Sequence, residues 1–254
     1  MRSIVLRFAS FFFAALLLAG CERETEEITL EQIGDYLPLQ PGKYITYLTD
    51  STVFTNFGRN TEIHTYEEKH VVDVEMTDNL GRPTMRIYRF IRDTAGNAPW
   101  QSSGTYFVTR LDKSAEWIEE NLRFVKLALP LRDGHSWKGN TYLPFEPFID
   151  KHNFSNDDNM YDWDYTITAT GETMVLGGET VPGIITVDQV NESINVPITT
   201  PTAYAAINYA VDKFAKGIGL VYQEFIMWEY QPNPGGPSPY KIGFGIKRSM
   251  IDHN

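Results

Sequence analysis

The sequence predicts a mainly β protein: a single antiparallel, strongly curved sheet, barrel or sandwich, of about ten strands with at most one or two short helices. Stretches rich in Val, Ile, Thr, Tyr and Phe alternate with clusters of Gly, Pro, Asn and Asp, as in strands joined by turns. No long helical period dominates the chain. Glycines at 217, 219, 243 and 245 fall inside or beside strand patterns, where glycine often marks a bulge or bend of a curved sheet.

The expected strands follow one another from residue 44 to residue 250. They are Tyr44–Leu48, His70–Met76, Met85–Ile91, Thr105–Leu111, Leu122–Leu129, Tyr161–Thr170, Thr173–Leu176, Ile184–Val190, Leu220–Tyr230 and Ile242–Met250. Three turns between them, Asp78–Gly81, Asp93–Asn97 and Gly177–Gly178, contain residues that tolerate positive φ. Such turns indicate hairpins, and therefore antiparallel pairing.

Two segments have a helical as well as a strand interpretation. Ala203–Phe214 is rich in alanine, and Glu116–Leu129 carries apolar residues three or four positions apart. For the second half of Glu116–Leu129 we favour a strand, because residues 122–127 can be read as an alternating pattern that Pro130 ends.

Residues 1–20 have the pattern of a secretory signal peptide with a lipidation site. Arg2 and Arg7 precede an apolar run, Phe8–Leu18, which is too short to span a bilayer and is followed by Ala-Gly and Cys21. This pattern resembles the bacterial lipobox, in which the chain is cleaved just before the cysteine, and the cysteine becomes the new N-terminus and is acylated by fatty acids such as palmitate. We therefore expect an anchored protein with a signal peptide (1–20), an acidic tether (21–35) and one β-rich domain (36–254).

The tether indicates where the protein is located, and the net charge indicates which class of partner is disfavoured. Residues 22–27, Glu-Arg-Glu-Thr-Glu-Glu, resemble the acidic stretch that directs some lipoproteins to the outer face of the outer membrane, so we favour surface display over periplasmic display. Loss of Arg2 and Arg7 with the leader would change the formal net charge from −11 to −13. An acidic domain disfavours nucleic acid as a partner, whereas the lipid supplies contact with a membrane.

No intact catalytic motif is present. Acylation of Cys21 would use the only thiol, and Ser136 lacks the glycine two positions later that a nucleophile elbow needs. The histidines form no short zinc pattern. We interpret His70 as a histidine that shares no metal site and is either on the surface or hydrogen-bonded within the protein. The acidic residues, including Glu119 and Glu120, give no sign of a pair across a cleft. We therefore expect no cofactor and no enzymatic activity.

Two groups of residues are candidates for binding. Aromatic residues are abundant enough to line an apolar pocket, and such a cavity would be lined by several of the tryptophans. The tryptophans are Trp100, Trp117, Trp137, Trp163 and Trp228. The acidic segment 153–164 offers oxygen ligands for calcium, with Asp157, Asp158 and Asp162 as the candidates, although its spacing is not that of an EF-hand and solvated carboxylates are the favoured interpretation.

Several longer strings together resemble a family of uncharacterised lipoproteins from Bacteroidetes. The strings are Glu120–Leu131, Gly134–Trp137 with Gly139 and Asn140, Tyr161–Tyr165, Phe214–Glu224 and Ile246–Asn254. They span most of the mature chain. The resemblance implies an exported, anchored domain with no assigned reaction and no catalytic residues to carry over.

Three hypotheses for function follow. The first is a non-catalytic envelope lipoprotein that serves a binding or structural purpose, with an envelope protein as the candidate partner. The second is a carrier or receptor that encloses a lipid, a glycan fragment or another small apolar ligand in an aromatic-lined cavity. A hydrolase is the third. Whether the interior is packed or hollow distinguishes the first two hypotheses.

Overall fold

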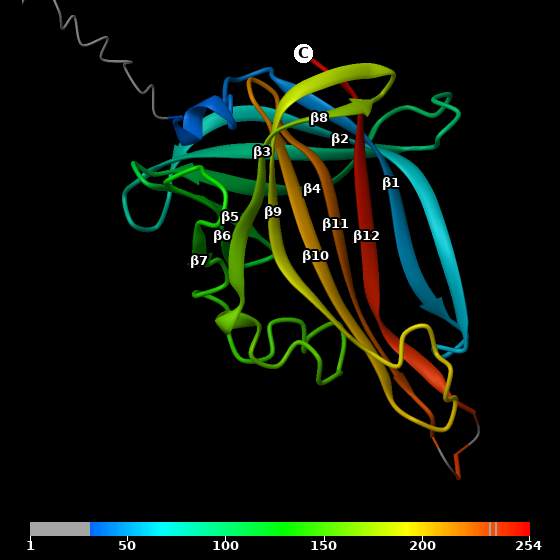
Figure 1. The fold of residues 1–254 in the computed structure, drawn as a ribbon. Helices are drawn as coiled ribbons and strands as arrows, with labels where there is room; N and C mark the ends of the chain where they lie inside the picture. The colour runs from blue at the N-terminus through cyan, green and yellow to red at the C-terminus, as the bar shows by residue number, and fades with distance from the viewer. Residues whose placement is uncertain (1–30, 234, 237) are drawn as a thin grey trace, which may run out of the picture. The chain divides into compact units, whose positions relative to one another are not determined.

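The computed structural model describes residues 31–233, 235–236 and 238–254 (Figure 1). Twelve strands form one antiparallel sheet, which confirms the predicted fold class with slightly more strands than expected. The strands are β1 (Tyr44–Thr55), β2 (Asn60–Thr77), β3 (Pro83–Arg92), β4 (Gln101–Arg110), β5 (Ser114–Glu119), β6 (Leu122–Ala128), β7 (Ser136–Lys138), β8 (Asp164–Leu176), β9 (Glu179–Ile194), β10 (Ala205–Ala215), β11 (Gly219–Gln231) and β12 (Tyr240–His253).

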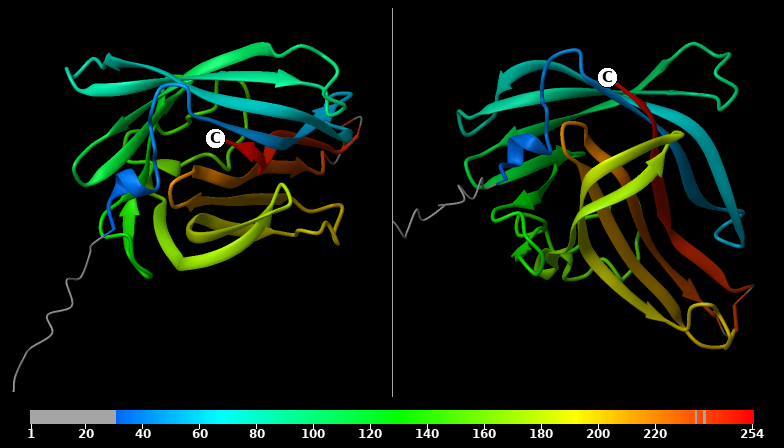
Figure 2. Two further views of the ribbon diagram at one scale, coloured as in Figure 1. Left: turned by 90° about the horizontal axis from the view of Figure 1, so that it is seen from above. Right: turned by 45° about the horizontal axis from the view of Figure 1, so that its top comes forward.

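The sheet is a meander whose two halves meet through the first and last strands. Its order is β6-β5-β4-β3-β2-β1-β12-β11-β10-β9-β8-β7, so β1 pairs with β12 in the middle. The sheet curls until its edge strands β6 and β7 approach each other (Figure 2). There the Val125 amide donates to the Gly139 carbonyl at 2.7 Å, and the Trp137 indole N–H donates to the Val125 carbonyl at 2.7 Å. The result is a nearly closed barrel.

The three predicted turns join consecutive strands. At the β2–β3 turn the Asp78 carboxylate accepts hydrogen bonds from the amides of Leu80 and Arg82, at 2.8 and 2.9 Å. Gly81 adopts a φ of +75°, a conformation that glycine reaches without strain. Gly177 and Gly178 connect β8 to β9, both with positive φ, as expected of a hairpin turn.

Several expected elements differ from those observed. The alanine-rich segment expected as a possible helix is strand β10, and Glu116–Leu129 belongs to a hairpin of two strands, β5 and β6. The strand expected from Tyr161 begins only at Asp164, because residues 160–162 form a 3-10 turn, η2 (Met160–Asp162). Within the described ranges the other helical element is η1 (Ile33–Asp35).

The folded part starts before residue 36, since Ile33 is buried against the core. The signal peptide, Cys21 and residues 22–30 of the tether lie outside the described residues. Among the described residues no helix has both the length and the apolar character needed to cross a membrane.

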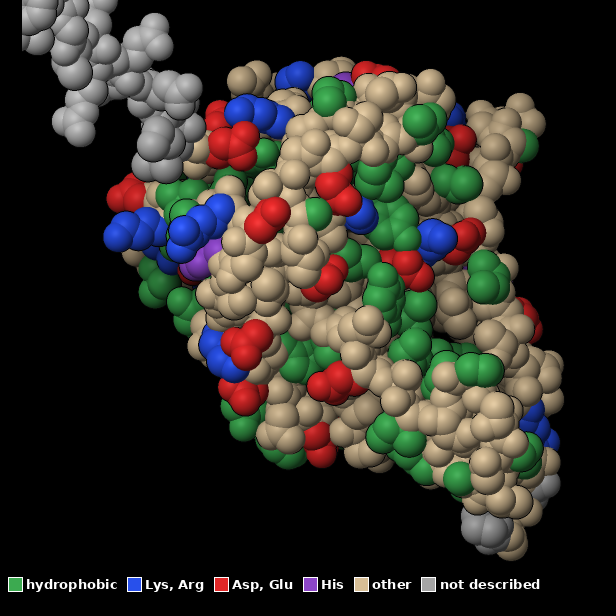
Figure 3. All heavy atoms as spheres, viewed as in Figure 1, with side chains coloured by type: hydrophobic (Ala, Val, Ile, Leu, Met, Phe, Trp, Pro, Cys, Tyr) green, Lys and Arg blue, Asp and Glu red, His purple; other side chains and the backbone are tan. Residues whose placement is uncertain are grey.

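Buried side chains pack the sheet at one end. The main cluster contains Tyr36, Trp117, Leu127, Tyr165 and Phe214 among others, and joins the N-terminal segment to strands from both halves of the sheet. On the face shown in Figure 3, acidic and basic side chains are scattered among apolar and polar ones. Two smaller buried clusters lie elsewhere in the interior, and a cavity remains that holds the candidate site.

Candidate ligand-binding site

A cavity of about 430 Å³ occupies the concave side of the sheet. Binding pockets for small molecules have volumes of ~300–1,000 Å³, so this cavity has room for an organic ligand. Alternate residues of each strand face it, as the pleat requires. They include Glu68 and His70 on β2, Arg89 on β3, Gln223 and Phe225 on β11, and Phe244, Ile246 and Arg248 on β12.

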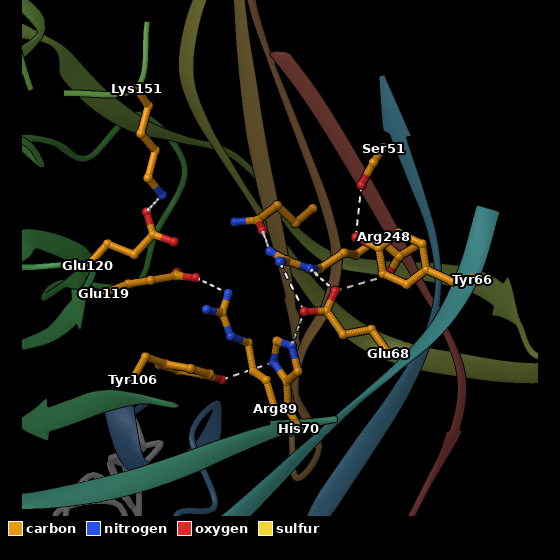
Figure 4. A network of polar contacts seen from close by, with 12 residues as sticks. Ser51, Tyr66, Glu68, His70, Arg89, Tyr106, Glu119, Glu120, Lys151 and Arg248 are labelled. Atoms are coloured by element: carbon orange, nitrogen blue, oxygen red, sulfur yellow. Dashed lines mark hydrogen bonds and ion pairs between the residues drawn. The ribbon is translucent and has the colours of Figure 1, made fainter. Parts of the chain in front are cut away.

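Glu68 and Arg248 form the centre of a buried polar network at the floor of the cavity (Figure 4). Arg248 donates to the two carboxylate oxygens of Glu68, from Nε at 2.8 Å and from Nη2 at 3.2 Å. Thr49 donates its hydroxyl to the same carboxylate at 3.2 Å. Such a two-pronged guanidinium–carboxylate contact fixes both side chains in position.

His70 joins this pair to the β4 strand. Its Nε2 lies 3.1 Å from a Glu68 oxygen, and its Nδ1 lies 3.1 Å from the Tyr106 hydroxyl. Tyr47 and Tyr106 place their rings edge-on to the imidazole, with centroids 4.9 and 5.3 Å away. Both ring nitrogens of His70 therefore face protein groups, although only Nδ1 has the geometry of a hydrogen bond.

Burial and charge together determine the ionisation of this network. Burial opposes ionisation of Glu68, but Arg248 and His70 beside it hold the pKa of this carboxyl well below its usual range. Burial lowers the pKa of His70, against the opposing influence of Glu68, so the ring is neutral at pH 7. For Arg248, burial is outweighed by Glu68 and Glu119, which raise the pKa of the guanidinium. The floor thus contains a carboxylate, a guanidinium and a neutral imidazole.

A second ion pair continues the network across the interior. Lys126, on edge strand β6, donates to Asp212 on β10 at 2.8 Å, and both side chains are buried. Gln189 and Gln223 donate their amide groups to the same carboxylate at 2.6 and 2.9 Å. Arg248 donates to Gln223 in turn, so the two ion pairs belong to one chain of hydrogen bonds.

Two further ion pairs lie nearer the opening. Arg89 is paired with Glu119, and Lys151 is paired with Glu120 at the β5–β6 turn. The side chains of Lys151 and Glu120 are 57% and 50% exposed, so this second pair meets solvent. Every charged residue that lines the cavity, His70 and His152 aside, therefore has a partner of opposite charge within it.

Phenylalanine rings line the cavity farther along β11 and β12, on the same strands as Gln223 and Arg248. Phe225 and Phe244 stack with their centroids 5.6 Å apart and their planes at 15°. Phe148, from the connection between β7 and β8, meets Phe244 edge-on at 5.2 Å, and His152 stacks on Phe244 at 5.2 Å. The connection is tied to the sheet by Ser155, which donates its amide and hydroxyl to Glu229, each at 3.0 Å. The lining of the cavity thus combines stacked aromatic rings with ion pairs.

Of the five tryptophans predicted to line a cavity, only Trp117 lines this one, so that part of the prediction is corrected. Trp228 faces the outside because it follows Phe225 by an odd number of positions on β11, and Lys241 lies 4.5 Å from its ring. Trp100 stacks on Arg92, also outside the cavity. Trp137 and Trp163 pack into the core beside the cavity.

The three aspartates proposed as calcium ligands do not form a ligand group. Asp157 turns inward and accepts a hydrogen bond from the Phe148 amide at 3.0 Å, and burial raises the pKa of this carboxyl. Asp162 is exposed and paired with Lys138 at 2.9 Å, and Asp158 joins neither of them in a site. Across the described ranges no group of three or more His, Cys, Asp or Glu side chains is arranged to hold a metal ion.

Most of the residues that form the site could not be recognised as site residues from the sequence. Glu68, Lys126, Asp212 and Arg248 occupy inward positions of strands, where a core residue would be expected. A signal was present, since Arg248 lies two positions after Ile246 and two before Met250 in a strand pattern. Inward-facing charges of this kind are rarely buried unless they are paired.

Comparisons with known proteins give little beyond the structure itself. No family model matches the chain, and no curated protein matches it. A solved structure from Bacteroides fragilis, described as a "putative exported protein with YmcC-like fold", is similar to this chain with 12% identity and a TM-score of 0.38. The match covers 85% of this chain and 96% of that one. Because a TM-score this low supports no argument, the proposals below rest on the residues of this chain.

Proposed function

We propose that this protein is a lipid-anchored binding protein of the bacterial envelope that holds a small ligand inside its curved sheet. The supporting observation is the 430 Å³ cavity, which is lined both by stacked phenylalanines and by a network of ion pairs. A hollow interior favours the carrier or receptor hypothesis over a purely structural module.

The location of the protein is part of the proposal. The lipobox at residues 18–21 and the acidic tether after it support export and acylation at Cys21. They favour the outer membrane, with the folded domain displayed at the cell surface. The motifs that resemble uncharacterised Bacteroidetes lipoproteins support the same location.

A non-catalytic role fits the chemistry of the floor. A general base needs a nitrogen or oxygen that can reach a substrate proton. Both nitrogens of His70 contact protein groups, and both oxygens of Glu68 accept from Arg248. These groups are arranged to hold one another, so we propose that they shape and polarise a binding site.

Dye binding in the interior tests this proposal. N-phenyl-1-naphthylamine gains fluorescence in apolar surroundings and should bind the mature domain. Ile246→Trp adds bulk inside the cavity and should abolish the gain, whereas Ile63→Trp, at a side chain that is 60% exposed and does not line the cavity, should leave it unchanged. Equal dye binding by wild type and Ile246→Trp would show that the dye does not bind in the cavity, and would overturn the proposal.

A further inference from the structure

We propose that the cavity selects an amphiphile without net charge, with a hydroxyl or carbonyl head group and an apolar body. This inference rests on the proposed function and names the ligand class for the same site. Three features support it: the balance of charges, a buried hydrogen-bond donor without a partner in the described ranges, and the position of the phenylalanines.

The charges that line the cavity cancel one another. The four pairs are Glu68–Arg248, Glu119–Arg89, Asp212–Lys126 and Glu120–Lys151. His70 adds no charge at pH 7 because burial lowers its pKa. A carboxylate or ammonium ligand would bring a charge for which no partner is left, and burying an unpaired charge is costly. A ligand without net charge avoids this cost.

The hydrogen-bonding groups of the floor favour an acceptor as the head group. The oxygens of Glu68 already accept from Arg248, and those of Asp212 accept from Lys126 and two glutamine amides. One hydrogen-bond donor, in contrast, remains without a partner in the part of the chain that the structure describes. Arg89 lines the cavity, and its Nε is buried and has no hydrogen-bond partner among the described residues. A buried donor without a partner costs free energy, and a hydroxyl or carbonyl oxygen would satisfy it.

The apolar body has a matching surface. Phe225 and Phe244 offer stacked rings farther along the strands that carry Gln223 and Arg248, and Phe148 packs against them from the β7–β8 connection. Ile246 and Leu122 extend the apolar lining. An alkyl chain placed against these side chains would remove its own surface and theirs from water, which is the main source of binding free energy for such ligands.

Three probes with the same ten-carbon chain test the selectivity for a neutral head group. They are 1-decanol, decanoate and decyltrimethylammonium, each used to displace N-phenyl-1-naphthylamine from the mature domain at pH 7. We expect 1-decanol to displace the dye at a concentration about tenfold or more below that of either ionic probe, a factor that corresponds to ~1.4 kcal/mol. Displacement by an ionic probe at an equal or lower concentration would overturn the inference.

Removing one member of a pair should change this selectivity in a predictable direction. Glu119→Gln leaves Arg89 without its carboxylate, so decanoate should gain about tenfold relative to 1-decanol. The matched control is Glu67→Gln, which removes the partner of Arg92 on the outer side of the same sheet and should change no probe. If Glu119→Gln leaves the order of the probes unchanged, the charge-balance argument is wrong.

The outcomes separate this inference from the proposed function. If the dye does not bind, or binds equally to Ile246→Trp, the binding role itself fails. If the dye binds in the cavity but decanoate or the ammonium probe displaces it best, the binding role holds and only the neutral ligand class is wrong.

Discussion

At the scale of single residues, Glu68 is the point where the interior hydrogen bonds converge. It is 3% exposed and lies within hydrogen-bonding distance of Thr49, His70 and Arg248, which come from three different strands. Such a carboxylate is tolerated in an interior because its charge is paired and its oxygens are saturated. The pairing also leaves the floor of the cavity with fixed polar groups for a ligand.

Removing the guanidinium should therefore be costly. Arg248→Met leaves Glu68 buried without its main partner, and we expect a loss of about 3–5 kcal/mol in the free energy of unfolding. Chemical denaturation measures it. Arg86→Met, which breaks a partly exposed pair with Asp73 on the outside, should cost much less, because solvent screens this pair. Equal losses in the two variants would contradict the importance given to the interior pair.

The stability of the fold should fall as the solution becomes acidic. The folded-state pKa of His70 lies below the value of 6.5 for an unperturbed histidine, so the unfolded chain takes up a proton first as the pH falls. The free energy of unfolding should decline below pH 6.5, and Glu68, whose pKa is held low, adds a second decline below 4.5. His152 acts in the same direction as His70, because burial lowers its pKa too.

Urea denaturation between pH 7 and pH 5 tests the contribution of His70. His70→Gln keeps a donor and an acceptor but cannot titrate, so it should have a smaller decline than wild type. His64→Gln, at an exposed histidine of the same strand, should retain the wild-type decline. An unchanged slope in His70→Gln would show that this ring does not titrate as the structure requires.

At the scale of elements, the approach of β6 to β7 determines how far the sheet closes. The contact depends on few groups, chiefly the amide of Val125, the indole of Trp137 and Gly139. Gly139 has no room for a side chain, since a Cβ there would lie 2.4 Å from the ring of Tyr165. The edge with β6 and β7 is thus closed by specific local contacts and by the interior Lys126–Asp212 pair.

Loss of the indole hydrogen bond should loosen this edge. Trp137→Phe removes the donor to the Val125 carbonyl, and we expect a loss of about 1 kcal/mol in stability. Hydrogen exchange should become faster in β5 and β6 and stay unchanged in β11 and β12. Trp228→Phe, an outer-face variant, serves as the control. Uniformly faster exchange along all strands of Trp137→Phe would contradict a local role for this contact.

The sequence predicted most strands because their composition and turns are local properties, but it failed where the surroundings decide the structure. The alanine-rich stretch of β10 has the intrinsic preference of a helix, yet it pairs along its length with β9 and β11, and this pairing overrides propensity. The β5 strand was missed because the Glu120–Asn121 turn has no glycine, although both residues adopt positive φ.

The candidate site was harder to predict than the fold. The tryptophans were expected to line a cavity because they are large and aromatic, but which side of a strand faces inward depends on the curvature of the sheet. Trp228 and Phe225 lie on the same strand and on opposite faces. The pairing of Glu68 with Arg248 joins residues that are 180 positions apart, and no local pattern reveals it.

At the scale of the whole molecule, we propose that the β-rich domain is attached to a membrane by a lipid at Cys21. The anchor is predicted from the sequence alone, because Cys21 lies outside the described residues. Several acyl chains on one residue would hold the protein stably, since each buried methylene contributes ~0.8 kcal/mol.

Membrane attachment should depend on that one residue. Cys21→Ala removes the only thiol, so we expect the protein to move from the membrane fraction to the soluble fraction after cell lysis. Immunoblotting of the two fractions measures this shift. Membrane association that persists in Cys21→Ala would show that another feature holds the protein at the envelope.

The most direct test of the central claim is to observe a ligand in the interior. Nuclear magnetic resonance of the mature domain with 1-decanol should give intermolecular NOEs between the alkyl chain and the rings of Phe148, Phe225 and Phe244. NOEs confined to exposed side chains such as Phe57 and Ile63, with none to the cavity rings, would contradict the account.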